Sequence, residues 1–470
     1  MRILLLAALL VPAPALAGKR KAPAPDLADT AAVVIGRALQ AKDTTWTRMQ
    51  ELCDDIGHRL SGTPELERAV DWAARRMEED GLSVTREPIE VQRWVRGSES
   101  LVIETSGRAR EVPILGLGNS VGTGGEVIEG EVLVVGSFEE LVAKKEAVKG
   151  KIVLYDVPFT TYGGTVGYRY RGASEAARHG AIASLVRSVG PTSLSTPHTG
   201  SLGYVDDVPQ IPAAAVDIET AAWLHRLQDR GQKATARLSM EAHFEDPVTS
   251  HNVVGELKGR ELPDQVVVVG CHLDSWDVGQ GAQDDAAGCV AAMEAGRILA
   301  SLDVRPRRTV RVVLFTNEEN GLAGGRGYQE AHADEDIVAA MEMDTGAGPF
   351  EGYRIDARTG GTDDETLAER ERIIAAFGAV EHLFTALDPE FVPSFSGADV
   401  GPLVDHGTLG IGLAMDTTGY WPIHHTEADT LDKIDRAHFQ RDVAGMALMT
   451  WVLAEWPDLP RVQRTLGGHP

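Results

Sequence analysis

The stretch VVVVGCHLDSWDVGQGAQDDAAGC, residues 266–289, decides the fold of this 470-residue chain. Its four consecutive valines predict a strand that is buried on both faces of a mostly parallel sheet. A Gly-rich loop follows, and from Ala286 onward the apolar residues recur with helical spacing. Because ligand sites in open α/β sheets lie just beyond the carboxyl ends of strands, we expect a site at this loop. The polar candidates there are His272, Asp274, Asp284 and Asp285.

The chain after residue 251 alternates between strand and helix patterns. This alternation predicts an α/β fold with a mixed, mostly parallel central sheet and helices on both faces. The expected strands after the valine run are residues 309–316, 337–343 and 410–415. The expected helices are residues 286–301, 325–333, 365–377, 399–405 and 437–455.

The first half of the chain contains two segments with different sequence patterns. Residues 27–117 contain three helical segments and then strand-like alternation; the clearest helix is residues 64–79, which Thr63 could cap. Residues 118–245 contain short strands among Gly- and Ser-rich loops, which predicts an inserted, smaller domain with its own core. We therefore expect a main domain formed by residues 27–117 and 246–460, with a C-terminal tail at residues 461–470.

The N-terminus has the pattern of a secretory signal peptide at residues 1–17. Arg2 gives a positive start, an apolar run follows at residues 3–11, and an A-x-A cleavage site ends at Ala17. The apolar run is too short to span a bilayer. We expect cleavage near Ala17 and export to the periplasm or the medium, with residues 18–26 as a flexible leader.

Composition excludes some partners. The chain has 45 basic and 70 acidic residues and a formal charge of −25, so it would repel nucleic acid and anionic membranes. Its three cysteines are Cys53, Cys271 and Cys289. An odd number leaves at least one thiol free in an exported protein. The pattern indicates no disulfide framework, and we expect Cys271 and Cys289 to be small buried residues.

Acidic residues and histidines gather at the ends of the predicted strands. Glu318 and Glu319 follow one strand, Asp344 follows the next, and the segment HHTEADT occupies residues 424–430. Each of these residues alone has an ordinary explanation, such as capping a turn. Together they would bury several carboxylates at one sheet edge, which costs several kcal/mol without cations. Imidazole and carboxylate are ligands of Zn²⁺, so the pattern predicts a two-metal site.

The combined motifs H-x-D, G-A-x-D-D, E-E, E-x-D and H-T-x-x-D-T resemble the co-catalytic zinc exopeptidases of metallopeptidase family twenty-eight. More narrowly, the chain is similar to the carboxypeptidase Q-like subgroup of that family. The segments that carry this narrower likeness are residues 52–62, 168–173, 183–189 and 197–200. The likeness covers nearly all of the chain after the predicted signal peptide.

The resemblance implies two zinc ions and a set of ligands for each ion. Asp284 would bridge the two ions. His272 and Asp344 would complete one coordination sphere, and Glu319 and His425 would complete the other. We choose His425 because the H-T-x-x-D-T pattern begins at the second histidine of the pair, which leaves His424 a packing or supporting role.

The resemblance also implies roles around the ligands. Glu318 would be the general base, and Asp274 would orient His272 through its carboxylate. Asp285 would hold the turn after the bridging aspartate, with a cis peptide between Asp284 and Asp285. Tyr420 or Tyr168 could donate a hydrogen bond to the oxyanion, and a plain packing role stays open for both.

The implied function is that of an exopeptidase which hydrolyses small unblocked peptides, chiefly dipeptides, through a metal-bound water activated by Glu318. The resemblance further implies a homodimer, and it implies that residues 118–245 form a protease-associated domain that helps to select substrates. Two alternatives stay open: a single-zinc glutaminyl cyclase, and a non-catalytic binding protein on the same scaffold. The pairing of His272 with Asp344 argues against the first. The retention of every ligand and of Glu318 argues against the second.

Overall fold

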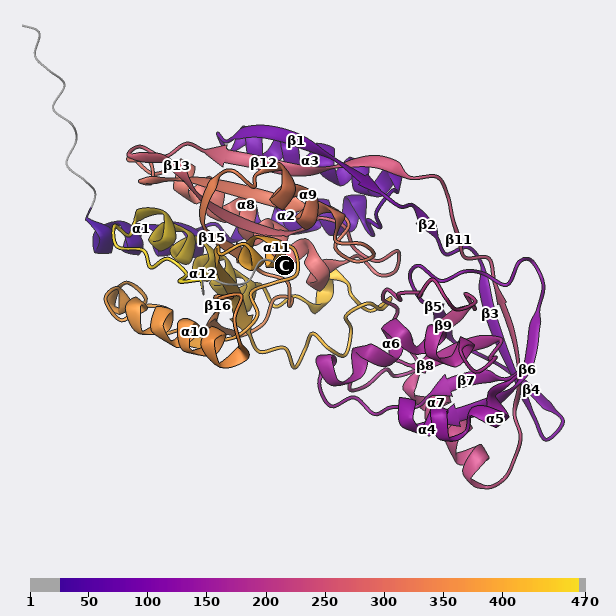
Figure 1. Ribbon diagram of the computed structural model, residues 1–470. Helices are drawn as coiled ribbons and strands as arrows, with labels where there is room; N and C mark the ends of the chain where they lie inside the picture. Colours follow the sequence, from indigo (N-terminus) through magenta and orange to yellow (C-terminus); the bar gives the residue numbers. More distant parts are fainter. Residues whose placement is uncertain (1–25, 465–470) are drawn as a thin grey trace, which may run out of the picture.

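A computed structural model of the protein describes residues 26–464. The predicted signal peptide, its cleavage site and the end of the C-terminal tail lie outside these residues. Figure 1 shows a larger lobe with a layered sheet and a smaller lobe beside it. Within residues 26–464, no helix is both long and apolar enough to cross a membrane.

The larger lobe is built on an eight-stranded sheet. Its four central strands, β14, β13, β15 and β18, are mutually parallel, and antiparallel pairs flank them. The prediction of a mixed, mostly parallel sheet is therefore confirmed. In spatial order the strands are β1 (Ser83–Val91), β12 (Val248–Leu257), β14 (Arg308–Phe315), β13 (Leu262–His272), β15 (Asp336–Glu342), β18 (Leu409–Met415), β16 (Phe350–Asp356) and β17 (Glu390–Pro393).

The valine run of β13 lies at the centre because both of its faces are covered. Val267 and Val269 belong to the apolar cluster that the sheet shares with α8 and α12. Val266 and Val268 belong to a second cluster with residues of α9 and α11. Since successive side chains of a strand point to opposite faces, a continuous valine run suits this position.

The helices of the larger lobe lie on both sides of the sheet (Figure 1). One helix, α12, is buried along most of its length because α1 and α8 pack against it. The expected cap is present on α3, where the Thr63 hydroxyl accepts a hydrogen bond from the Leu66 main-chain N–H. The helices are α1 (Leu27–Gln40), α2 (Lys42–Gln50), α3 (Pro64–Glu79), α8 (Ala287–Ala300), α9 (Ala323–Ala331), α10 (Asp363–Phe377), α11 (Gly401–Asp405) and α12 (Arg436–Glu455).

The smaller lobe contains a second eight-stranded sheet. In spatial order its strands are β4 (Arg108–Val112), β3 (Glu99–Thr105), β10 (Thr235–Met240), β6 (Ile128–Val135), β7 (Ile152–Tyr155), β8 (Ala183–Arg187), β9 (Ala213–Val216) and β5 (Ile114–Gly116). Its helices are α4 (Phe138–Ala143), α5 (Lys145–Val148), α6 (Tyr162–Ala177) and α7 (Ile218–Asp229).

The smaller sheet begins before residue 118, where we expected the inserted domain to start. Strands β3, β4 and β5 all precede that residue, and Leu101 and Ile103 of β3 complete the apolar core beneath α7. The chain enters and leaves this lobe through the paired strands β2 (Trp94–Val95) and β11 (His243–Phe244), which run side by side in Figure 1.

Two of the three cysteines form a disulfide, so the expectation of none was wrong. Cys271 at the end of β13 and Cys289 in α8 are both buried, as predicted, and their Cα atoms are 5.1 Å apart. The chain folds back through the site loop so that α8 packs on β13, which brings the two residues together. Cys53 is free and buried, and burial raises the pKa of its thiol to about 12.

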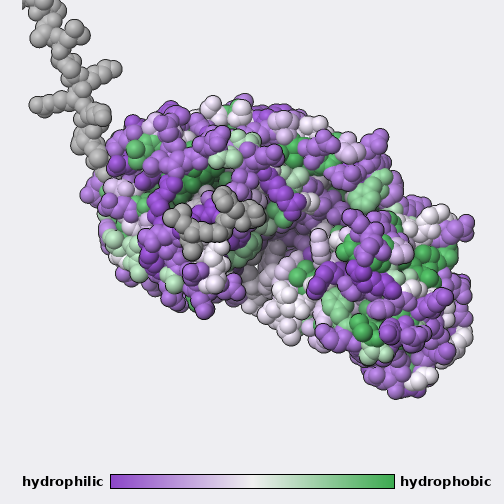
Figure 2. Space-filling view, viewed as in Figure 1, coloured by the Kyte–Doolittle hydropathy of each residue, from purple (hydrophilic) through white to green (hydrophobic). Residues whose placement is uncertain are grey.

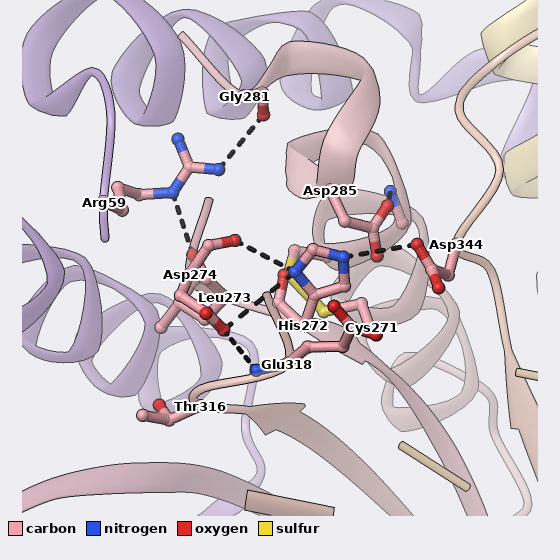
Figure 3. The surroundings of a disulfide bond; sticks show 12 residues. Arg59, Cys271, His272, Leu273, Asp274, Gly281, Asp285, Thr316, Glu318 and Asp344 are labelled. Atoms are coloured by element: carbon pink, nitrogen blue, oxygen red, sulfur yellow. Dashed lines mark hydrogen bonds and ion pairs between the residues drawn. A yellow bond between two sulfur atoms is a disulfide. The ribbon is translucent and has the colours of Figure 1, made fainter. Parts of the chain in front are cut away.

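Arg59 joins the N-terminal helices to the site loop. Arg59 lies in the chain between η1 (Glu51–Ile56) and α3, and its side chain is fully buried. The guanidinium donates to the main-chain carbonyls of Leu273 at 2.9 Å, Gly57 and Gln280 at 2.8 Å, and Gly281 at 3.1 Å. Figure 3 shows the contacts with Leu273 and Gly281. One cation therefore satisfies four carbonyls that come from two distant segments.

Replacement of Arg59 is expected to destabilise the larger lobe. An Arg59→Met variant leaves buried carbonyls without donors, which should lower the free energy of unfolding by about 3 kcal/mol or more. Urea unfolding followed by tryptophan fluorescence measures this change. Arg68→Met is the matched control, because Arg68 is exposed and forms an ion pair with Glu65. Equal unfolding midpoints for the two variants would contradict this account of Arg59.

Candidate metal centre

The candidate site lies at the carboxyl ends of three adjacent parallel strands. His272 is the last residue of β13, Glu318 and Glu319 follow β14, and Asp344 follows β15. Because these strands are parallel neighbours, their ends meet at one sheet edge, where the sequence placed the site.

Asp284 lies between two histidines, and each of its carboxylate oxygens faces one of them. Its Oδ1 is 3.1 Å from His272 Nε2, and its Oδ2 is 3.2 Å from His425 Nε2. A further carboxylate completes each side: Asp344 Oδ1 is 3.2 Å from His272 Nε2, and Glu319 Oε2 is 3.2 Å from His425 Nε2. The result is two groups of one histidine and one carboxylate that share Asp284.

This donor set suits a pair of zinc ions. Imidazole nitrogens and carboxylate oxygens are typical zinc ligands, and Glu319 Oε1 is buried without a hydrogen-bond partner among residues 26–464. Burial raises the pKa of the Glu319 carboxyl to about 7, and the nearby Asp284 carboxylate adds to that shift. Cations would offset the cost of burying these acids together. The residues present therefore fit the metals that the sequence pattern predicts.

The carboxylate of Asp274 holds the glutamate loop rather than the ring of His272. His272 Nδ1 faces the main-chain carbonyl of Asp274 at 3.0 Å, whereas the Asp274 carboxylate is 4.0 Å away (Figure 3). That carboxylate accepts the main-chain N–H groups of Glu318 at 3.1 Å and Glu319 at 3.3 Å, and also the Ser61 hydroxyl. The nearer partner of the His272 ring is thus the Asp274 main-chain carbonyl, and the expected carboxylate–histidine contact is the longer of the two.

The backbone around the shared Asp284 is held by hydrogen bonds that two other aspartates, Asp285 and Asp429, accept. The Asp284–Asp285 peptide is cis, as the resemblance implies. Asp285 accepts the Gly288 main-chain N–H at 3.0 Å, near the start of α8. Asp429, the aspartate of the H-T-x-x-D-T motif, accepts the main-chain N–H groups of Gln283 at 2.8 Å and Asp284 at 3.2 Å. These contacts fix where the Asp284 carboxylate points.

Only one of the two candidate tyrosines lies at the site. The Tyr420 hydroxyl donates to Asp284 Oδ2 at 3.0 Å. Tyr168 instead packs in the core of the smaller lobe, with its ring centroid 4.4 Å from that of Phe138. On α6 the side chains that face the site are Tyr162 and Arg169, which are two turns apart on one helix face, and Tyr168 points elsewhere.

The smaller lobe contributes contacts to His425 that the sequence reasoning missed. His425 Nδ1 lies 3.3 Å from the Thr199 carbonyl, and the Thr199 main-chain N–H donates to the His425 carbonyl at 2.9 Å. The Arg169 guanidinium donates to the same Thr199 carbonyl and to the Tyr162 hydroxyl. Both Arg169 and Thr199 lie in segments quoted for the family likeness, but their spacing gives no sign that they reach the metal centre.

His424 and His425 occupy different environments. His425, not His424, contacts Asp284 and Glu319. His424 is buried among aromatic side chains, and burial holds the pKa of its ring well below the usual range. His424 is therefore a neutral packing residue beside the site.

A cavity of about 790 Å³ opens onto these residues, which is a suitable size for a small ligand. Figure 2 shows a recess where the two lobes meet. The larger lobe lines the cavity with Glu318, Asp344, Arg354 and Tyr420, and the smaller lobe lines it with Tyr162 and Arg169.

Comparisons with known proteins agree with this geometry. Residues 252–450 match the model of Peptidase family M28. The chain is 37% identical to carboxypeptidase Q of Bos taurus over 430 residues, which is 90% of this chain and 88% of that protein. It is 37% identical to carboxypeptidase Q of Homo sapiens, over 92% of this chain and 90% of that protein.

Solved structures give the same result. A peptidase M28 precursor from Shewanella amazonensis superposes with a TM-score of 0.83 at 30% identity, over 91% of this chain and 98% of that one. A zinc aminopeptidase from Bacillus subtilis shares the fold, with a TM-score of 0.64 at 20% identity, over 88% of this chain and 96% of that one. The resemblance drawn from the motifs is confirmed: the chain belongs to peptidase family M28 and is a metallopeptidase homologous to carboxypeptidase Q.

Proposed function

We propose that this metallo-exopeptidase uses two zinc ions to hydrolyse small unblocked peptides, chiefly dipeptides. The position of Asp284 carries the proposal, because its two oxygens face two separate histidine–carboxylate pairs. Asp284 would bridge the ions. His272 and Asp344 would hold one, and Glu319 and His425 would hold the other. Bound zinc would polarise the scissile carbonyl and lower the pKa of the attacking water.

Glu318 is the proposed general base. It lines the cavity, and its carboxylate makes no hydrogen bond with another residue between 26 and 464, so it is free to meet water and substrate. Burial raises the pKa of its carboxyl well above the usual range, which favours proton uptake. Glu318 would accept a proton from the attacking water and pass it to the leaving amine.

Tyr420 and the smaller lobe support the same reaction. The Tyr420 hydroxyl lines the cavity and donates to Asp284 Oδ2; during attack it would turn its single proton from Asp284 to the oxyanion. Tyr162 and Arg169 line the cavity from the smaller lobe. The named relatives, a carboxypeptidase and an aminopeptidase, also act at peptide ends, which favours an exopeptidase.

A Glu318→Gln variant tests the proposed base. It removes proton uptake and leaves the other metal-facing side chains in place, so kcat on a dipeptide should fall at least about a hundredfold. Zinc content should stay near two ions per chain. Chromatography of the released amino acids gives the rate, and elemental analysis gives the zinc. Glu330→Gln, an exposed glutamate on α9, is the control. Full turnover by Glu318→Gln would remove Glu318 from the mechanism.

The zinc content of histidine variants tests the ligand assignment. Wild-type protein should hold near two zinc ions per chain after gentle purification. A His425→Ala variant should lose one of them, because only Glu319 and the shared Asp284 remain on that side, whereas His272, Asp344 and Asp284 still hold the other ion. A His424→Asn variant should keep both. A single zinc in the wild type would favour the glutaminyl cyclase alternative.

Substrates with blocked ends test the exopeptidase assignment. A free dipeptide should be cleaved, and the same dipeptide with both ends blocked should be cleaved at least about a hundredfold more slowly, because both end contacts are lost. Rates over a panel of free, N-acetylated, C-amidated and doubly blocked dipeptides measure this. Rapid cleavage of the doubly blocked peptide would show that the enzyme is not an exopeptidase.

A further inference from the structure

The cavity is lined by an arginine side chain that has no hydrogen-bond or ion-pair partner among residues 26–464. Arg354 lies in β16, is half-buried and lines the same cavity as Glu318 and Asp344. Its guanidinium makes no hydrogen bond or ion pair with any residue in the described part of the chain. Arg169, the other arginine of the cavity lining, is already engaged by Tyr162 and Thr199.

The strand register fixes where Arg354 stands relative to the metal centre. Arg354 of β16 is paired with Gly412 of β18, and Gly412 is paired with Glu342 of β15. Directly paired residues share a sheet face, and two strand spacings amount to about 10 Å. Asp344 follows Glu342 by two residues and lies at the same edge. Arg354 therefore lies on the metal-centre side of the sheet, two strands away from the acidic residues.

The cavity lining carries both signs of charge. Glu318 and Asp344 supply carboxylates at the metal centre, and Arg354 supplies a guanidinium two strands away in the same sheet. Leaving a cation half-buried and unpaired costs free energy, although the guanidinium stays charged. An extended dipeptide spans about 7 Å and carries an ammonium group at one end and a carboxylate at the other. If its carboxylate pairs with Arg354, this length places its peptide bond toward the metal centre.

We propose that Arg354 binds the α-carboxylate of the peptide substrate and so selects small peptides with a free C-terminus. This inference rests on the proposed function and names the specificity of the same site. The guanidinium can pair with a carboxylate through two parallel hydrogen bonds. A dipeptide bound in this way would place its single peptide bond toward the metal centre. A longer peptide held by the same carboxylate would have to extend its N-terminal residues past the metal centre.

The test compares a free dipeptide with its C-amidated form. In the wild type, kcat/KM should be about tenfold to a hundredfold higher for the free dipeptide, mainly through KM. Arg354→Met should abolish most of this ratio, and Arg354→Lys should restore part of it, because lysine keeps the charge but not the two-pronged geometry. Arg68→Met, an exposed arginine outside the cavity, should keep the wild-type ratio. Zinc content and melting temperature report whether each variant is folded.

Peptide binding to the zinc-loaded Glu318→Gln protein, followed by calorimetry, measures the same preference without turnover. Introducing Arg354→Met into that protein should remove the preference for the free carboxylate. The inference is overturned if Arg354→Met keeps the wild-type ratio, or if it weakens both peptides equally. Failure of the proposed function would give a different result, because the wild type would then cleave no peptide. The ratio of the calorimetric affinities for the free and the C-amidated dipeptide would still decide the role of Arg354.

Discussion

The carboxylate of Asp284 is the constraint on which the rest of the site depends. Its two oxygens must each face a different histidine, and this requires two parts of the chain to be held at once. The strand β13 supplies His272, and the loop that carries His425 is fastened to the smaller lobe through Thr199. Asp429 fixes the backbone of Gln283 and Asp284 by accepting their main-chain N–H groups. The buried helix α8 and the parallel strands supply the rigid frame for this geometry.

Much of the larger lobe could be predicted because its sequence is locally consistent. The valine run of β13, the Thr63 cap of α3 and the apolar spacing of α8 each specify one structure. The candidates His272, Glu319 and Asp344 could be predicted because parallel strands deliver their terminal residues to one edge, whereas the full ligand set came from the family resemblance. By contrast, β16 reads FEGYRID, with an interior glycine and a single β-branched residue, and the sequence did not predict it.

The remaining differences come from contacts that only tertiary structure creates. The disulfide depends on how α8 packs against β13, which residue spacing does not specify. Asp274 was expected to hold His272 with its carboxylate, but the backbone carbonyl is nearer, and such a choice depends on local dihedral angles. Tyr168 and Arg169 are adjacent in sequence, yet only Arg169 faces the cavity, because helix α6 turns one side chain inward. The contacts of Arg169 and Thr199 join segments that lie more than two hundred residues apart.

Anomalous scattering at the zinc edge, from crystals of the protein purified without chelator, would test the central claim most directly. Two anomalous peaks are expected, one on each side of the Asp284 carboxylate and about 3.5–4 Å apart. The peak nearer His272 should also lie against Asp344, and the peak nearer His425 should lie against Glu319. A single peak, or two peaks that do not share Asp284, would contradict the proposed two-zinc centre.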